Sequence, residues 1–248
     1  MIAAELNRYN IDIAALSETR LADEGSLSEV GDGYTFFWKG LPSSGRRIHG
    51  VGFAVRTTLL NSIPETPTAI SERLMTLRVP LAKNRYMTVL SAYAPTLPSD
   101  EDVKDRFYDS LGAARRSVPG DDKIVLLGDF NARVGSNYHV WKGVIGRHGL
   151  GNANSNGFRL LNLCSEFDLV ITNTLFQQRN QRKATWQHPR SKHWHLIDYV
   201  IVRRRDVKDA TLTRVMRVMR GAKCWTDHRL VRATFQLKVR PLARKKKH

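Results

Sequence analysis

The stretch KIVLLGDFN, residues 123–131, decides the fold class of this chain. Its apolar residues 124–127 follow one another without polar alternation, which is typical of a strand covered on both faces. Gly128 then permits a turn or a close backbone approach, and Asp129 and Asn131 come where the strand should end. We therefore predict a central strand whose end presents a carboxylate and a carboxamide in the same direction.

The remaining sequence predicts an α/β domain with more strands than helices. The predicted strands are 11–16, 34–38, 51–56, 73–79, 87–93, 169–172, 196–202 and 230–239. The predicted helices are 1–9, 100–117 and 157–167, the last with Phe158, Leu161, Leu163 and Cys164 facing inward. Because hairpins mix with crossovers, we expect two packed mixed sheets with helices outside. One domain would span 1–239, followed by a disordered basic tail at 240–248.

The charge of the chain indicates a polyanionic partner. It has 40 Lys and Arg against 23 Asp and Glu, a formal net charge of +17 and a pI near 10.3. An excess of this size favours nucleic acid over a merely solvated basic surface. An anionic membrane is the weaker alternative, because no basic amphipathic helix with a matching apolar face is visible.

The cysteines and the N-terminal sequence favour an intracellular location. Cys164 and Cys224 stand apart without zinc-ligand spacing, which favours a reduced compartment over a single disulfide. No apolar run approaches the length of a membrane span, and the residues after Met1 show no signal-peptide pattern. We expect a nuclear or cytoplasmic monomer without membrane association.

Polar side chains of similar kind follow five of the predicted strands. Each alone is explained by a helix cap, a turn or the core. Together, acidic groups, one His and one Asn at successive strand ends indicate the site of a metal-dependent hydrolase. The residues are Glu18, Tyr93, Asp129, Asn131, Asp198, Asp227 and His228.

Five ordered motifs carry a resemblance to a known family. SET at Ser17, GDFN at Gly128, Thr-Trp at Thr185, IDYV at Ile197 and TDHRL at Thr226 resemble the endonuclease/exonuclease/phosphatase superfamily. The chain is most similar to the apurinic-endonuclease-like domains of non-LTR retrotransposons and to craniofacial development protein 2-like proteins. The resemblance implies a four-layer α/β sandwich and a divalent-metal phosphodiesterase.

The same resemblance implies a role for each site residue. Glu18 and Asp227 match the metal ligands, for Mg²⁺ with Mn²⁺ as a substitute. The remaining matches are Asp129 with Asn131 as the Asp-x-Asn pair, Tyr93 as a phosphate contact, His228 with its supporting Asp198, and Asn154 and Asn156 on the nucleic-acid side. Chemistry agrees, because Mg²⁺ prefers carboxylates and retains several waters, while Asp129 can orient or deprotonate a water.

Aromatic and basic residues in the loops extend this prediction. Arg46, Arg47, Arg190 and Lys192 lie in predicted loops and are candidates for contact with phosphates. Large aromatic residues are more often core residues than platforms for base stacking. We apply that interpretation to three tryptophans: Trp186, Trp194 and Trp225.

One departure from the family bears on activity. Relatives begin with a strand whose Asn supports the metal-site Glu, and we expect this sequence to lack that strand, which would leave a truncated fold, an open sheet edge and a weakened metal site. Three functions stay open on these grounds. They are a DNA endonuclease that leaves a 3′-hydroxyl, a catalytically impaired nucleic-acid-binding relic, and an RNA-directed nuclease of the same fold.

Overall fold

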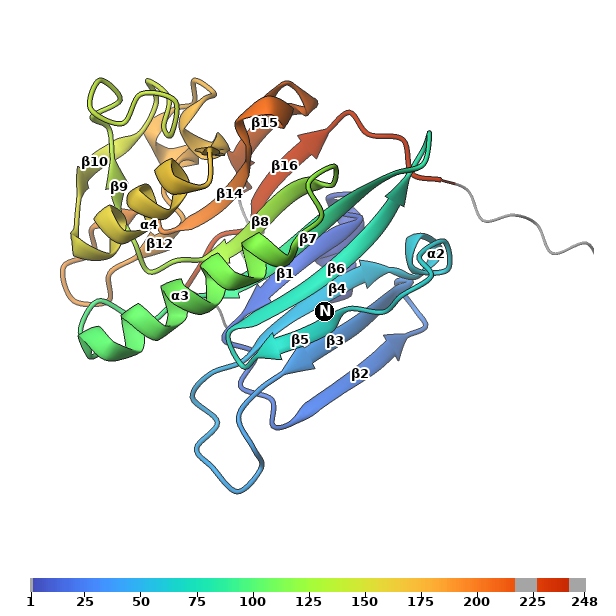
Figure 1. The fold of residues 1–248 in the computed structure, drawn as a ribbon. Helices are drawn as coiled ribbons and strands as arrows, with labels where there is room; N and C mark the ends of the chain where they lie inside the picture. Colours follow the sequence, from blue (N-terminus) through green and yellow to red (C-terminus); the bar gives the residue numbers. More distant parts are fainter. Residues whose placement is uncertain (1, 217–226, 241–248) are drawn as a thin grey trace, which may run out of the picture.

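A computed structural model describes residues 2–216 and 227–240, and two large sheets form its centre (Figure 1). The first sheet is antiparallel, in the order β1 (Ile13–Ser17), β4 (Val51–Arg56), β3 (Tyr34–Lys39) and β2 (Glu24–Glu29). The second has the order β11 (Leu169–Ile171), β14 (Asp198–Arg203), β8 (Lys123–Asp129), β7 (Arg85–Tyr93), β6 (Leu74–Leu81) and β5 (Thr68–Ser71). Only the β7–β8 pair is parallel in this six-stranded sheet, which makes it the mixed one.

Helices and small sheets complete the fold. The helices are α1 (Ile2–Arg8), α2 (Thr57–Leu60), α3 (Glu101–Ser117) and α4 (Ser155–Glu166), with short 3₁₀ turns at Thr172–Thr174, Asn180–Arg182 and Arg204–Asp209. The two-stranded sheets are β9 (Val134–Gly135) with β10 (Leu150–Ala153), β12 (Trp186–Gln187) with β13 (Trp194–His195), and β15 (Ala210–Val215) with β16 (Val231–Phe235). No helix of the described residues is long and apolar enough to cross a bilayer.

The predicted central strand is confirmed as β8, which lies between β14 and β7. Ile124 and Leu126 belong to the core that α3 and α4 build on one face of the six-stranded sheet. Val125 belongs to a cluster on the other face, against which the apolar side chains of β16 pack. Because both faces are covered, every side chain of the strand interior can be apolar, as residues 124–127 are.

Four layers result from this packing. Val51, Phe53 and Val55 of β4 pack on the six-stranded sheet, on the face away from α3 and α4. Ala3 and Leu6 of α1 cover the outer side of the four-stranded sheet. The four-stranded sheet and β16 thus share one layer, between the six-stranded sheet and α1 (Figure 1).

Gly128 is required where β8 approaches β7. Its φ of +149° is a backbone conformation that residues with a side chain rarely adopt. A Cβ at this position would lie 1.8 Å from the backbone oxygen of Ala92. The glycine therefore lets the strand end turn Asp129 into the site without a clash.

Several sequence predictions need correction. Phe158 does not face inward but is 49% exposed, because the buried stripe of α4 runs through Asn156, Gly157, Leu160, Leu161, Leu163 and Cys164. The last strand ends at Phe235 rather than at residue 239. The β15–β16 register shifts between Ala210 and Leu212, which lie opposite this end of β16. The sequence does not predict β2, β5 or β15, nor the short strands β9, β10, β12 and β13. Cys224, Trp225 and most of the basic tail lie outside the described residues.

Candidate active site

Three of the predicted residues lie side by side on neighbouring strands. In the register of the six-stranded sheet, Tyr93 on β7 is opposite Asp129 on β8, and Asp129 is opposite Asp198 on β14. Residues directly opposite each other bring their side chains close together on one face of the sheet. The sheet itself thus builds a row of one phenol and two carboxylates.

Asp129 is the buried centre of this row, with 2% of its surface exposed. One carboxylate oxygen, Oδ1, accepts the backbone N–H of Asn131 at 2.8 Å, and Ser17 Oγ lies 3.4 Å from the backbone nitrogen of Asp129. Burial, reinforced by the nearby charge of Asp198, raises the pKa of Asp129 well above its usual range. A carboxylate of this kind accepts a proton more readily than an exposed one.

Asn131 leaves the strand in a left-handed conformation, with a φ of +46°. Its Nδ2 donates to the backbone oxygen of Ala94 at 3.0 Å, which fixes the carboxamide beside the end of β7. The extended geometry expected from sequence therefore ends at Asp129, and a turn rather than strand continuation positions Asn131.

His228 joins the two carboxylates. Its Nδ1 lies 3.0 and 3.1 Å from the carboxylate oxygens of Asp198, and its Nε2 lies 3.9 Å from Oδ2 of Asp129. Burial by itself lowers the pKa of His228, but the hydrogen bond to Asp198 and the surrounding negative charges outweigh it and raise the pKa to about 9. The ring therefore carries a positive charge at neutral pH.

Two residues outside the predicted set of site residues hold Asp198 in place. Thr185 Oγ1 accepts the backbone N–H groups of Ile197 and Asp198 at 3.1 and 3.3 Å. Asn173 donates from Nδ2 to the backbone oxygen of Asp198 at 3.1 Å. Thr185 carried a sequence signal through the Thr-Trp motif, whereas Asn173 is recognisable only once the sheet is formed.

Glu18 lies just after β1 and reaches the row from the other sheet. Its Oε1 accepts the hydroxyl of Tyr93 at 2.7 Å, and its Oε2 accepts Arg20 at 3.0 Å. Burial, together with the bond to Glu18, raises the pKa of Tyr93, so its hydroxyl stays a donor. The Glu18 side chain is 40% exposed, which leaves it accessible from solvent.

Asp227 lies just before β16 and is exposed. Its Oδ2 accepts the indole N–H of Trp186 at 2.6 Å, so Trp186 has a polar role beside the site. The core interpretation is wrong for Trp194, which is 38% exposed on β13 with the guanidinium of Arg229 3.4 Å from its ring centroid. Trp194 is exposed because it lies on a two-stranded hairpin, and so small a sheet does not bury the side chains on both of its faces.

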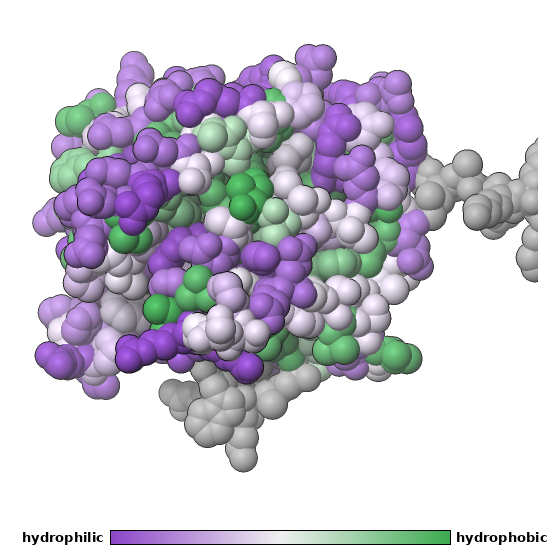
Figure 2. Space-filling model, turned by 60° about the horizontal axis from the view of Figure 1, so that its bottom comes forward, coloured by the Kyte–Doolittle hydropathy of each residue, from purple (hydrophilic) through white to green (hydrophobic). Residues whose placement is uncertain are grey.

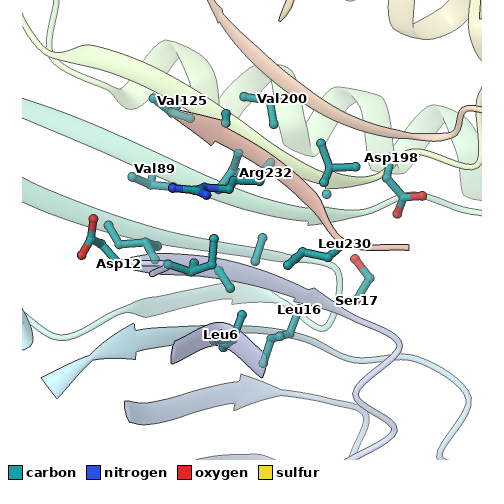
Figure 3. Close-up of a pocket in the computed structure, with 18 of the residues that line it drawn as sticks. Leu6, Asp12, Leu16, Ser17, Val89, Val125, Asp198, Val200, Leu230 and Arg232 are labelled. Carbon is teal, nitrogen blue, oxygen red and sulfur yellow. The ribbon is translucent and has the colours of Figure 1, made fainter. Parts of the chain in front are cut away.

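The acidic residues share one cleft with a volume of about 1140 Å³. Glu18, Asp129, Asp198, Asp227 and His228 all line it. Figure 3 shows Ser17 and Asp198 together near one end and Asp12 at the other. Residues from both sheets therefore meet at this end of the cleft.

The donor set fits a divalent cation. Ligand atoms of Asp129, Asp198 and His228 lie within 4.8 Å of one another. His228 is a poor ligand, because its raised pKa keeps it protonated and Asp198 occupies Nδ1. Glu18 and Asp227 are not part of this group. Their role as metal ligands stays a prediction, which rests on the preference of a hard cation for carboxylate oxygens.

The predicted nucleic-acid contacts fall into two groups. Arg46, Arg47, Arg190 and Lys192 are exposed in loops. Figure 2 shows a face of the molecule on which hydrophilic side chains predominate and hydrophobic ones form small separate groups. The exposure of these four basic side chains leaves them accessible to a polyanion.

The two asparagines are engaged inside the protein. Asn154 caps α4, with Oδ1 accepting the N–H groups of Gly157 and Arg133 at 2.8 and 2.9 Å. The buried Asn156 donates to the backbone oxygens of Pro95 and Asn131 at 3.1 and 3.0 Å. Both thus brace the segment that carries Asn131, and their contact with nucleic acid stays a prediction.

Known proteins resemble the chain in sequence. It is 35% identical over 243 residues to Craniofacial development protein 2 of Bos taurus, which covers 97% of the chain and 39% of that protein. The protein of the same name from Tragulus javanicus is also 35% identical over 243 residues, covering 97% of the chain and 40% of that protein. The chain thus spans about two fifths of the length of these curated relatives.

Solved structures resemble it in fold. The APE2 catalytic domain of Xenopus laevis has a TM-score of 0.68 at 15% identity, covering 98% of this chain and 89% of that one. The AP endonuclease LMAP of Leishmania major has a TM-score of 0.65 at 13% identity, with coverages of 97% and 82%. The endonuclease domain of TRAS1, a telomere-specific non-LTR retrotransposon, has a TM-score of 0.59 at 13% identity, with coverages of 95% and 91%.

The family model described as "Endonuclease/Exonuclease/phosphatase family" matches residues 1–228, from α1 through His228. The four layers and the strand-end carboxylates agree with this match. The chain therefore belongs to the endonuclease/exonuclease/phosphatase family.

Proposed function

We propose that this chain is a divalent-metal-dependent phosphodiesterase that nicks one strand of DNA and leaves a 3′-hydroxyl. The observation that carries the proposal is that Glu18, Asp129, Asp198, Asp227 and His228 line one cleft, in which His228 lies beside both Asp198 and Asp129. The net charge of +17 supports a polyanionic substrate. The similar structures include AP endonucleases and a retrotransposon endonuclease domain, which supports DNA as that substrate.

Glu18 and Asp227 would hold the cation, Mg²⁺ or in its place Mn²⁺. An ion bound there would polarise a phosphoryl oxygen and stabilise the charge of the leaving oxygen. Tyr93 and Trp186 donate to these two carboxylates and so restrict their orientation. Such supporting hydrogen bonds typically change metal affinity or activity by about 10–100-fold.

Asp129 accepts the proton of the attacking water in this mechanism. Its raised pKa suits a general base better than an ordinary aspartate, because catalysis improves as the pKa of the base approaches the working pH. The backbone N–H of Asn131 holds one oxygen of Asp129, which leaves the other directed toward His228. The carboxamide of Asn131 supplies a donor to the phosphate.

His228 provides positive charge where negative charge develops on the phosphate. Asp198 orients the ring through Nδ1, so Nε2 is the nitrogen that faces the cleft beside Asp129. Fixed donors of this type are worth about a hundredfold or more in rate when one is removed. Arg46, Arg47, Arg190 and Lys192 would hold the flanking phosphates, which predicts binding that weakens steeply with salt.

Nicking of supercoiled plasmid tests the proposal. We expect Mg²⁺ or Mn²⁺ to support conversion to open circles and EDTA to abolish it. A polymerase should extend the nicks directly, because extension requires a free 3′-hydroxyl. A folded preparation that binds DNA but produces no metal-dependent nicks would reject the proposal in favour of a binding role, and cleavage confined to a matched single-stranded RNA would reject DNA as the substrate.

A further inference from the structure

One residue, Arg73, holds the tyrosine that supports Glu18. Arg73 immediately precedes β6, and its backbone oxygen accepts the N–H of Tyr93 at 2.9 Å. Its Nη1 donates in return to the backbone oxygen of Tyr93 at 3.1 Å, and its guanidinium carbon lies 5.3 Å from the centre of the Tyr93 ring. Arg73 therefore contacts both backbone polar groups and the ring of the residue whose hydroxyl donates to Glu18.

Within the described part of the chain, no carboxylate hydrogen-bonds to the buried guanidinium of Arg73. The residue is 9% exposed, and its ion pair with Glu72 is long, with Oε1 3.9 Å from Nε. That distance is too great for a hydrogen bond. Burial also lowers the pKa of Arg73, because the charged form loses its hydration. A buried charge costs free energy unless it is closely paired, so an ion pair does not account for this arginine.

The second amino group of the guanidinium faces a histidine instead. Nη2 of Arg73 lies 3.0 Å from Nε2 and 3.2 Å from Nδ1 of His49, which follows the exposed loop residues 42–48. Burial, followed by the charge of Arg73, lowers the pKa of His49. The ring is therefore neutral at pH 7, and a neutral imidazole has one nitrogen that can accept a hydrogen bond from Arg73.

The two bonds fix the plane of the guanidinium. Its amino groups form a rigid fork, so one group can bond to Tyr93 only while the other points in one set direction, which is where His49 lies. A lysine offers a single ammonium on a flexible stem and cannot reproduce this geometry. The arginine thus links the end of β7 to the base of the loop that carries Arg46 and Arg47.

We infer that Arg73 is a positioning residue of the active site, which holds Tyr93 so that the tyrosine hydroxyl orients Glu18. Arg73 acts through Tyr93 and need not touch the cation or the substrate. The effect on metal binding rests on the proposed role of Glu18 as a ligand, whereas the positioning of Tyr93 does not. Supporting residues of metal ligands typically change metal affinity by about 10–100-fold, and we expect about tenfold for Arg73, which is one step further removed.

Fluorine NMR of the full chain labelled with 3-fluorotyrosine tests the positioning directly. The chain has seven tyrosines, and the resonance that is lost in Tyr93→Phe identifies Tyr93. Arg73→Ala should move this resonance, because the guanidinium leaves both the ring and the backbone oxygen of Tyr93. Guanidinium chloride far below its denaturing concentration should move the resonance back, and an equal concentration of sodium chloride should not.

Titration with Mn²⁺ measures the metal site in the same spectra. This ion is paramagnetic and broadens resonances near its binding site, so it should broaden that of Tyr93. The Mn²⁺ concentration for half-maximal broadening should rise about tenfold in Arg73→Ala. His49→Leu, which removes the acceptor, should raise that concentration as well, and His49→Gln, which retains an acceptor, should leave it nearly unchanged.

Arg78→Ala is the matched control. Arg78 lies on β6, opposite Thr88 rather than at the end of β7, and it donates twice to Asp122. Its guanidinium carbon lies 3.7 Å from the centre of the Tyr86 ring. The variant should lower the melting temperature and move the resonance of Tyr86, while the Tyr93 resonance and the Mn²⁺ titration stay as in the unmodified chain.

Three results would overturn the inference. They are an unmoved Tyr93 resonance in folded Arg73→Ala, an unshifted Mn²⁺ titration in that variant, and equal changes of the Tyr93 resonance and the titration in Arg78→Ala, which would mean a general loosening of the sheet. Nicking takes no part in this test. A chain that meets these expectations but does not nick DNA would reject the proposed function and leave the inference standing.

Discussion

Nδ1 of His228 lies 3.0 Å from Oδ2 of Asp198, so the segment that leads into β16 contacts the first residue of β14. This contact ties the small β15–β16 sheet to the end of the six-stranded sheet. Because Asp198 is opposite Asp129 in the β14–β8 register, the same ring also faces the buried carboxylate. One imidazolium thus offsets the negative charge of two neighbouring aspartates.

Replacing the ring should remove catalysis and spare binding. In His228→Ala we expect the nicking rate to fall by about a hundredfold or more, because a charged donor to the phosphate is lost. DNA affinity at moderate salt should stay within a fewfold, since the proposed phosphate contacts come from exposed residues of other loops. His139→Ala changes an exposed histidine on another loop and serves as the control. Wild-type rates in His228→Ala would contradict the assigned role.

Trp186 should control how tightly the cation binds. Trp186→Phe removes the 2.6 Å hydrogen bond to Asp227 and frees that carboxylate to rotate. We expect the Mg²⁺ concentration for half-maximal nicking to rise about tenfold, with little change in rate at saturating Mg²⁺. Trp194→Phe, on the same hairpin, leaves the bond intact and should not shift the Mg²⁺ dependence. An unshifted Mg²⁺ titration in Trp186→Phe would show that the bond does not support the metal site.

Gly128 should tolerate no side chain. Gly128→Ala places a methyl group 1.8 Å from the Ala92 oxygen at a φ of +149°, so we expect the free energy of unfolding to fall by more than about 3 kcal/mol. Urea unfolding measures this loss. At Gly120, an added Cβ meets nothing within 4 Å, and Gly120→Ala should change stability by less than about 1 kcal/mol. Equal effects of the two substitutions would mean that β8 does not approach β7 as described.

The buried Asp122 should make the free energy of unfolding depend on pH. Burial by itself raises the pKa of Asp122, but hydrogen bonds from Arg78 at 2.8 and 3.0 Å and from Thr88 outweigh it and lower the pKa. A pKa that is lower in the folded than in the unfolded state stabilises the protein above the usual aspartate pKa of about 4, and this contribution is lost as the pH falls. Asp122→Asn should therefore cost about 2 kcal/mol at pH 7 and less below about pH 4.

Unfolding curves for the two proteins at several pH values measure the difference. Glu166→Gln breaks an ion pair with Arg116 in which both side chains are more than half exposed, and it should cost less than about 1 kcal/mol at every pH. A cost of Asp122→Asn that stays constant from pH 7 into the acid range would contradict the assigned charge state.

The sequence predicts those parts of the fold that depend on local patterns. The run 124–127 indicates a doubly covered strand because no polar residue interrupts it, and β8 is that strand. The strand β2, EGSLSE, has no such signal, since its single large apolar residue, Leu27, is 61% exposed. Such edge strands form because a neighbour offers backbone partners, and this cannot be seen in their own residues.

The sequence likewise indicates some of the site residues and not others. Asp129 and Asp198 are recognisable as polar ends of buried strands, and their direct opposition follows once β8 and β14 pair. Trp186 and Asn173 act through hydrogen bonds to residues distant in sequence, Asp227 and Asp198. Nothing in the neighbouring residues specifies those partners, so the tertiary fold is needed to reveal them.

The most direct measurement compares nicking of supercoiled plasmid by the unmodified chain, Asp129→Asn and Asp121→Asn, with equal Mg²⁺ and matched melting temperatures. Asp129 is the buried base of the proposed reaction, whereas Asp121 is an exposed aspartate in the turn before β8. We predict metal-dependent nicking that is unchanged in Asp121→Asn and abolished in Asp129→Asn, with DNA binding nearly intact in both. Undiminished nicking by Asp129→Asn would contradict the account.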